Sequence, residues 1–216
     1  MKAPTTPMSL LIVLTLLLAA VPAMAQSTLY SNGPLDDDTD AWTINSGFVV
    51  SDTFTLTSNA NVNGFMFNAW VFPGDVVESV EVSLTSSEFG GTDYFDQVVN
   101  FTQSNCSVNA YGFNVCLESG SFSGPNLAAG TYWLNLDNAI VNTGDPVYWD
   151  ENSGEGCHSP GCPSLASENS VGTIPSESFT VLGNSGSSSI PEPATILLFG
   201  SGVVGLAKAV RRKLAA

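Results

Sequence analysis

Between residues 27 and 182 the sequence contains runs in which apolar and polar residues alternate with a period of two. This period indicates strands and not helices. In residues 80–85, for example, apolar side chains take every second position. That spacing is typical of strands with one buried face, because successive side chains of a strand point to opposite sides. Turn-forming residues such as Asn63-Gly64 and Pro73-Gly74-Asp75 separate the runs. About nine short strands divided in this way predict an all-β ectodomain over residues 26–182, an antiparallel β-sandwich that is jelly-roll-like.

The distribution of charge excludes several classes of partner. The chain has 216 residues with 20 acids and five bases, and residues 26–190 contain every acid except Glu192 and no base. This stretch therefore carries a formal charge of −19. Because nucleic acids and anionic membrane surfaces are bound through basic side chains, we expect neither as a partner of this part of the chain.

The N-terminus predicts export. Residues 1–25 place Lys2 before an apolar run from Met8 to Ala20, and Ala23-Met24-Ala25 follows as a small-residue cleavage pattern before Gln26. This order is that of a secretory signal peptide. Residues 1–25 are therefore not expected to contribute to the folded domain.

The C-terminus predicts a short membrane helix. A Gly/Ser-rich linker over residues 183–190 precedes an apolar stretch, and residues 194–210 are expected to form one transmembrane helix. At about 1.5 Å per residue this helix spans roughly 25 Å, which is short for a permanent anchor in a ~30 Å hydrocarbon core. The basic cluster Arg211, Arg212 and Lys213 follows directly, so the positive-inside rule places residues 26–190 outside the cytoplasm.

The order of these C-terminal features matches a known sorting signal. Pro191-Glu192-Pro193, the apolar helix and the cluster Arg211, Arg212 and Lys213 resemble the PEP-CTERM sorting domain, a module over residues 191–216 that is also called the ice-binding protein C-terminal domain. The resemblance implies that an exosortase, a membrane-embedded cysteine transpeptidase, reads the Pro-Glu-Pro and removes the helix. It also implies a Gram-negative bacterium that makes exopolysaccharide and biofilm, with this protein at its outer surface or in its extracellular matrix.

Four cysteines in an exported chain predict two disulfides. Three pairings are possible, and nearness in the sequence favours Cys106 with Cys116 and Cys157 with Cys162. A zinc site built from Cys157, His158 and Cys162 is the alternative, but it lacks a fourth ligand and its spacing matches no common zinc finger.

An acidic run near the start of the domain is a candidate calcium loop. Asp36, Asp38 and Asp40 stand at alternate positions, as in the opening of an EF-hand loop. The sixth and twelfth positions are Ala41 and Gly47, which do not fit that loop. Two interpretations remain open, namely a looser Ca²⁺ site and a solvated acidic turn.

A second candidate site follows from aromatic and acidic residues in one loop. Trp149 and Asp150 are candidates for carbohydrate binding, and Trp42, Trp70 and Trp133 are further aromatic candidates, although most of the four tryptophans are expected in the core. Asp150 and Glu151 should point to opposite faces of a strand, so they are not expected to act together as a glycosidase pair.

The function predicted from these features is that of a binding or structural protein. With His158 as the only histidine and no paired catalytic groups, we expect no enzyme activity. The leading hypothesis is a secreted, exosortase-sorted surface or exopolysaccharide-matrix protein with a structural or adhesive role. The alternative is a calcium-assisted carbohydrate-binding module at the cell surface.

Overall fold

The computed structural model describes residues 26–33, 40–152 and 159–185. With the exception of Ser185, these residues belong to the first of two compact units, Met1–Asn184; the second is Ser185–Ala216. The strands of the first unit are β1 (Ser27–Ser31), β2 (Ala41–Thr43), β3 (Val50–Leu56), β4 (Ala60–Val71), β5 (Val77–Ser87), β6 (Gly90–Val108), β7 (Asn114–Ser121), β8 (Asn126–Leu127), β9 (Gly130–Val141), β10 (Tyr148–Asp150), β11 (Ala166–Glu168), β12 (Gly172–Ile174) and β13 (Phe179–Ser185).

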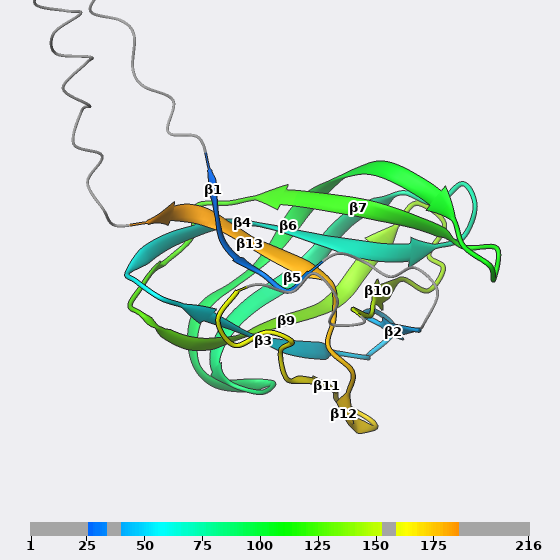
Figure 1. Ribbon diagram of the computed structural model, residues 1–216. Coiled ribbons are helices and arrows are strands. Elements are labelled where there is room, and N and C mark those ends of the chain that lie inside the picture. Colours follow the sequence, from blue (N-terminus) through cyan, green and yellow to red (C-terminus); the bar gives the residue numbers. More distant parts are fainter. Residues whose placement is uncertain (1–25, 34–39, 153–158, 186–216) are drawn as a thin grey trace, which may run out of the picture. The chain divides into compact units, whose positions relative to one another are not determined.

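The strands form a large antiparallel network, so the predicted all-β class is confirmed. Their main order is β1-β13-β4-β7-β6-β5-β9-β3-β11-β12; β10 joins β4 to β2, and β8 pairs with β4 (Figure 1). Among the described residues there is no helix, and accordingly none long and apolar enough to cross a membrane. The predicted helix 194–210 and the linker 183–190, apart from its first three residues, lie outside them.

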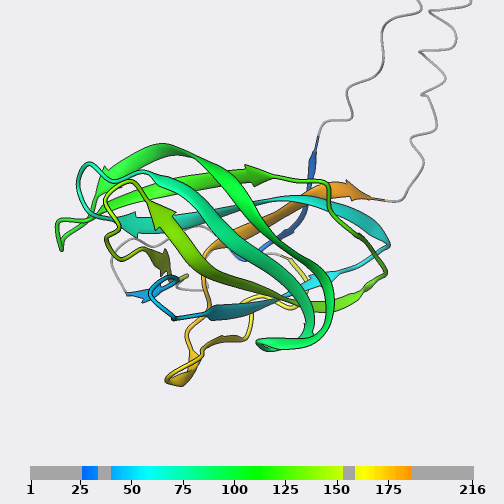
Figure 2. The same cartoon turned by 180° about the vertical axis from the view of Figure 1, so that it is seen from behind.

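Strand β6 links two groups of strands. It pairs with β5 up to Asn100 and with β7 from Phe101 onward, so a single strand of 19 residues changes its partner midway. One group contains β1, β13, β4 and β7, and the other contains β5, β9, β3, β11 and β12 (Figures 1 and 2). The β6–β7 hairpin extends the first group and carries the aromatic turn described below.

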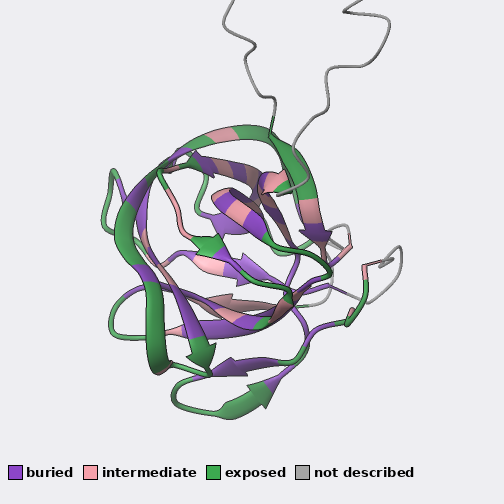
Figure 3. Cartoon of the chain, turned by 90° about the vertical axis from the view of Figure 1, so that its left-hand side faces the viewer, coloured by how far each residue is buried: buried purple, intermediate pink, exposed green. Residues whose placement is uncertain are grey.

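Both groups contribute side chains to one core. Tyr30 of β1 contacts Phe54 of β3 with ring centroids 6.2 Å apart, and Phe179 of β13 contacts Tyr30 at 5.5 Å. Buried positions recur along the strands of both groups (Figure 3), as the period of two predicts. Burying these rings removes apolar surface from water and is the main source of stability for such a domain.

The predicted disulfide between Cys106 and Cys116 is confirmed. It connects β6 to the neighbouring strand β7, with 4.1 Å between the two Cα atoms. Cys162 is disulfide-bonded as well, but Cys157 and His158 lie outside the described residues, so the pairing of Cys157 with Cys162 stays a prediction.

Candidate functional site

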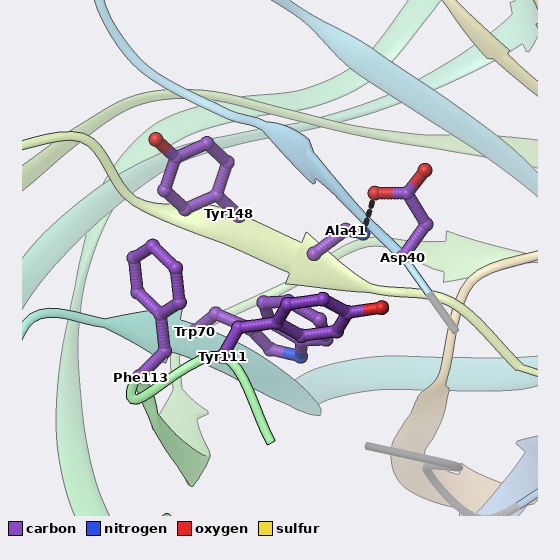
Figure 4. A pocket seen from close by; sticks show the side chains of 6 residues that line it. All are labelled: Asp40, Ala41, Trp70, Tyr111, Phe113 and Tyr148. Atoms are coloured by element: carbon purple, nitrogen blue, oxygen red, sulfur yellow. Dashed lines mark hydrogen bonds between the residues drawn. The ribbon is translucent and has the colours of Figure 1, made fainter. Parts of the chain in front are cut away.

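A cavity lined mostly by aromatic side chains opens at one end of strands β4 and β10. Its volume is about 380 Å³. The lining residues come from four separate parts of the chain (Figure 4): Asp40 and Ala41 at the start of β2, Trp70 near the end of β4, Tyr111 and Phe113 in the turn between β6 and β7, and Tyr148 at the start of β10. We refer to this cavity as the aromatic pocket.

Strand register puts two of these rings on one face. Tyr148 of β10 lies directly opposite Trp70 of β4, and residues paired in this way point to the same side of a sheet. Trp149, the next residue, therefore points to the other side. The alternation along β10 thus assigns Tyr148 to the pocket and Trp149 to the core.

The turn that supplies Tyr111 and Phe113 is held by its own side chains. The Asn109 Oδ1 accepts hydrogen bonds from the backbone N–H groups of Tyr111 and Phe113, each at 3.0 Å. Gly112 has a φ of 86°, a left-handed conformation that glycine adopts without strain. The Cys106–Cys116 disulfide closes the same hairpin a few residues away, so the turn is fixed at its tip and at its base.

The rings form a connected group. Trp70 and Tyr111 are stacked with centroids 5.7 Å apart and an angle of 27°, and Phe113 lies 5.8 Å from Trp70 and 5.7 Å from Tyr148. Trp70 is only 6% exposed, whereas Tyr111 is 64% exposed. Tyr111 thus covers Trp70 and leaves its own outer face exposed to solvent, where a ligand could contact it.

Two adjacent acids hold two different tryptophans. The Trp70 Nε1–H donates to Asp150 Oδ1, and the Trp42 Nε1–H donates to Glu151 Oε1 at 2.6 Å. The side chains of Asp150 and Glu151 therefore point to opposite faces of the strand, as expected from the period of two. Asp150 is fully buried and does not line the aromatic pocket, but its hydrogen bond fixes the orientation of the Trp70 indole.

The carbohydrate candidate Trp149 lies in the core. Its ring is fully buried, 6.0 Å from Phe67 and 5.6 Å from Phe179, and its indole N–H donates to the Ser178 carbonyl at 2.9 Å. The ring is thus not available to a ligand at the surface. Of the four tryptophans, Trp70 is the one that lines the aromatic pocket.

Several carboxyl groups are buried without a base to neutralise them. Glu177 pairs across the strands with Glu151, and its backbone N–H donates to Asp52 Oδ2 at 2.8 Å. Burial, together with the nearby acids Asp52, Glu151, Asp150 and Asp40, raises the pKa of Glu177 well above its usual value. Burial likewise raises the pKa of Asp52 to about 7. Burial thus makes both groups harder to ionise than exposed carboxyl groups.

The candidate calcium loop falls mostly outside the structure. Asp36 and Asp38 are not among the described residues, and Asp40 lies at the rim of the aromatic pocket. Over residues 26–33, 40–152 and 159–185, no three Asp, Glu, His or Cys side chains are arranged to hold a metal ion. The calcium site therefore stays a prediction.

The comparisons with known proteins bear on the C-terminus. A family model described as the PEP-CTERM protein-sorting motif matches residues 189–213. This range contains Pro191, Glu192, Pro193, Arg211, Arg212 and Lys213, so the predicted sorting signal is confirmed, although these residues lie outside the described structure. A search of curated proteins gives no match. The chain is thus an all-β domain followed by a PEP-CTERM motif, and that motif indicates an extracellular protein sorted by an exosortase.

Proposed function

We propose that this protein is an adhesive component of the cell surface or exopolysaccharide matrix, and that its β domain binds polysaccharide through the aromatic pocket. The observation that carries the proposal is the exposed ring of Tyr111, stacked on Trp70 beside Phe113 and Tyr148. Flat aromatic faces pack against the C–H groups of a sugar ring, and the pocket walls are held in place before any ligand arrives.

The lining of the pocket favours binding without catalysis. Among the described residues, six line the pocket, and of these six only Asp40 carries a carboxyl group. Glycoside hydrolysis uses two carboxyl groups on either side of the scissile bond, and Asp150 behind Trp70 is buried. We therefore propose a binding protein rather than an enzyme.

For the fold and the route to the surface we infer the finer features expected from the sequence. A strand that passes from one group to the other across a shared core supports a β-sandwich. The PEP-CTERM motif supports anchoring through the helix 194–210, removal of that helix by an exosortase, and delivery to the outer surface of a Gram-negative cell.

Replacing Tyr111 with alanine should weaken polysaccharide binding about tenfold, because the exposed half of the aromatic wall is lost. Tyr94→Ala is the matched control, since Tyr94 is also exposed and its ring packs on Tyr132 instead of lining the pocket. Isothermal titration of the exported protein with a panel of neutral, amino and acidic oligosaccharides measures the effect. The proposal fails if no oligosaccharide binds, or if the two variants lose affinity equally.

The calcium loop can be tested separately. If Asp36, Asp38 and Asp40 bind Ca²⁺ in the folded state, millimolar Ca²⁺ should raise the melting temperature of the exported protein by mass action. The Asp38→Asn variant should lose most of this increase. Ca²⁺ would also stabilise the domain by screening its formal charge of −19. If Ca²⁺ raises the melting temperature of the wild type and of the variant equally, screening explains the whole effect and the calcium site is rejected.

A further inference from the structure

The aromatic pocket combines two features that attract positive charge. The aromatic side chains of Trp70, Tyr111, Phe113 and Tyr148 line one space (Figure 4). An aromatic face carries the negative part of the ring quadrupole, and Tyr111 has the most exposed of these rings. A cation within about 6 Å of such a face is attracted to it electrostatically. Asp40 adds a carboxylate at the same rim; its Oδ1 accepts the Ala41 N–H at 2.9 Å, which fixes its position.

A buried hydrogen bond orients the Trp70 ring in the pocket. The Trp70 indole N–H donates to Oδ1 of Asp150, which is fully buried. Trp70 is in turn stacked under Tyr111, the most exposed of the lining rings. This hydrogen bond and this stacking fix the Trp70 ring beneath Tyr111.

The rest of the domain offers no counter-charge for an anionic ligand. Residues 26–190 contain no Lys or Arg, so no lysine or arginine of the domain can neutralise a uronate, sulfate or phosphate group. A neutral sugar would stack on the rings but would gain little from Asp40 beyond a hydrogen bond. A sugar that carries an ammonium group would gain from stacking, from the cation–π interaction and from the carboxylate together.

We propose that the aromatic pocket selects polysaccharide containing amino sugars with free, protonated amines. The inference rests on the proposed function, since it names the class of polysaccharide that the same pocket binds. N-acetylation removes the charge of the amine, so the acetylated form of the same sugar is the closest ligand that the pocket should discriminate against.

The test compares three tetrasaccharides, those of glucosamine, N-acetylglucosamine and glucose. Each is titrated into the exported protein in chelator and low salt, below the pKa of the sugar amine. The glucosamine tetramer should bind at least tenfold more tightly than the other two. The preference should fall several-fold in Asp40→Asn and disappear in Tyr111→Ala, but persist in Tyr111→Phe, which keeps the ring.

Asp93→Asn is the matched control, because Asp93 is an exposed acid of β6 that does not line the pocket. Its glucosamine preference should equal that of the wild type. If Asp93→Asn and Asp40→Asn weaken binding equally, the attraction is a property of the whole charged domain and the inference is wrong. Equal or tighter binding of the N-acetylated tetramer overturns the inference and leaves the proposed function intact. Binding of none of the three, together with none in the wider panel, overturns both.

Discussion

The Glu118→Gln variant is expected to be more stable than the wild type at pH 8 and equally stable near pH 4.5. Glu118 lies in β7 opposite Phe67, is fully buried, and among the described residues neither of its carboxyl oxygens has a hydrogen-bond partner. Burial raises its pKa from 4.5 to about 8. Between these values the folded state keeps the proton and the unfolded state loses it, so the free energy of unfolding falls as the pH rises.

The loss amounts to roughly 1.4 kcal/mol per pH unit, or on the order of 4 kcal/mol across the interval. Glutamine has the shape of the protonated carboxyl and does not ionise, so the variant should avoid this loss. Urea unfolding at both pH values measures the difference, with Glu78→Gln as the control because Glu78 is exposed on β5. A stability difference that is the same at pH 4.5 and pH 8 would show that ionisation of Glu118 is not responsible.

The second large effect is expected at the C-terminus. We expect the mature protein to lack the residues from about Pro193 onward. A proline on each side of Glu192 disfavours helical backbone there, so the proposed membrane helix should begin after this tripeptide and leave it accessible to a processing enzyme. Glu192→Ala should leave full-length protein in the membrane. Replacing Arg211, Arg212 and Lys213 with serine should instead release unprocessed protein, since these charges resist translocation. Intact-mass measurement of protein extracted from the surface decides between these outcomes; a mass that includes Ala216 would mean that the anchor is permanent.

The strands that the sequence predicts well are those with several alternating residues. The run at residues 80–85 lies inside β5, and 54–57 lies largely in β3. Strands β8 and β10–β12, by contrast, have two or three residues each. These segments are strands because their backbones pair with a neighbouring strand of the sheet. A run of two or three residues is too short to show a period of two in the sequence.

The site shows a second limit of sequence reasoning. Tyr148 and Trp149 are adjacent aromatic residues, and a period of two requires that they face opposite ways without deciding which faces the core. The register of β10 between β2 and β4 makes that decision and buries Trp149. Tyr111 and Phe113 could have been found from the sequence, since two aromatic residues flank a glycine inside the Cys106–Cys116 hairpin.

The claim that polysaccharide binds at the aromatic pocket is tested most directly by nuclear magnetic resonance. The protein has four tryptophans, and each indole N–H gives its own signal. On titration with the glucosamine tetramer, the Trp70 indole signal and the backbone amides of Tyr111 and Phe113 should shift together. The indole signal of Trp149, which is buried and bonded to the Ser178 carbonyl, should stay in place. Unchanged signals for Trp70 and Tyr111 at saturating ligand, or shifts confined to residues away from the pocket, would contradict the account.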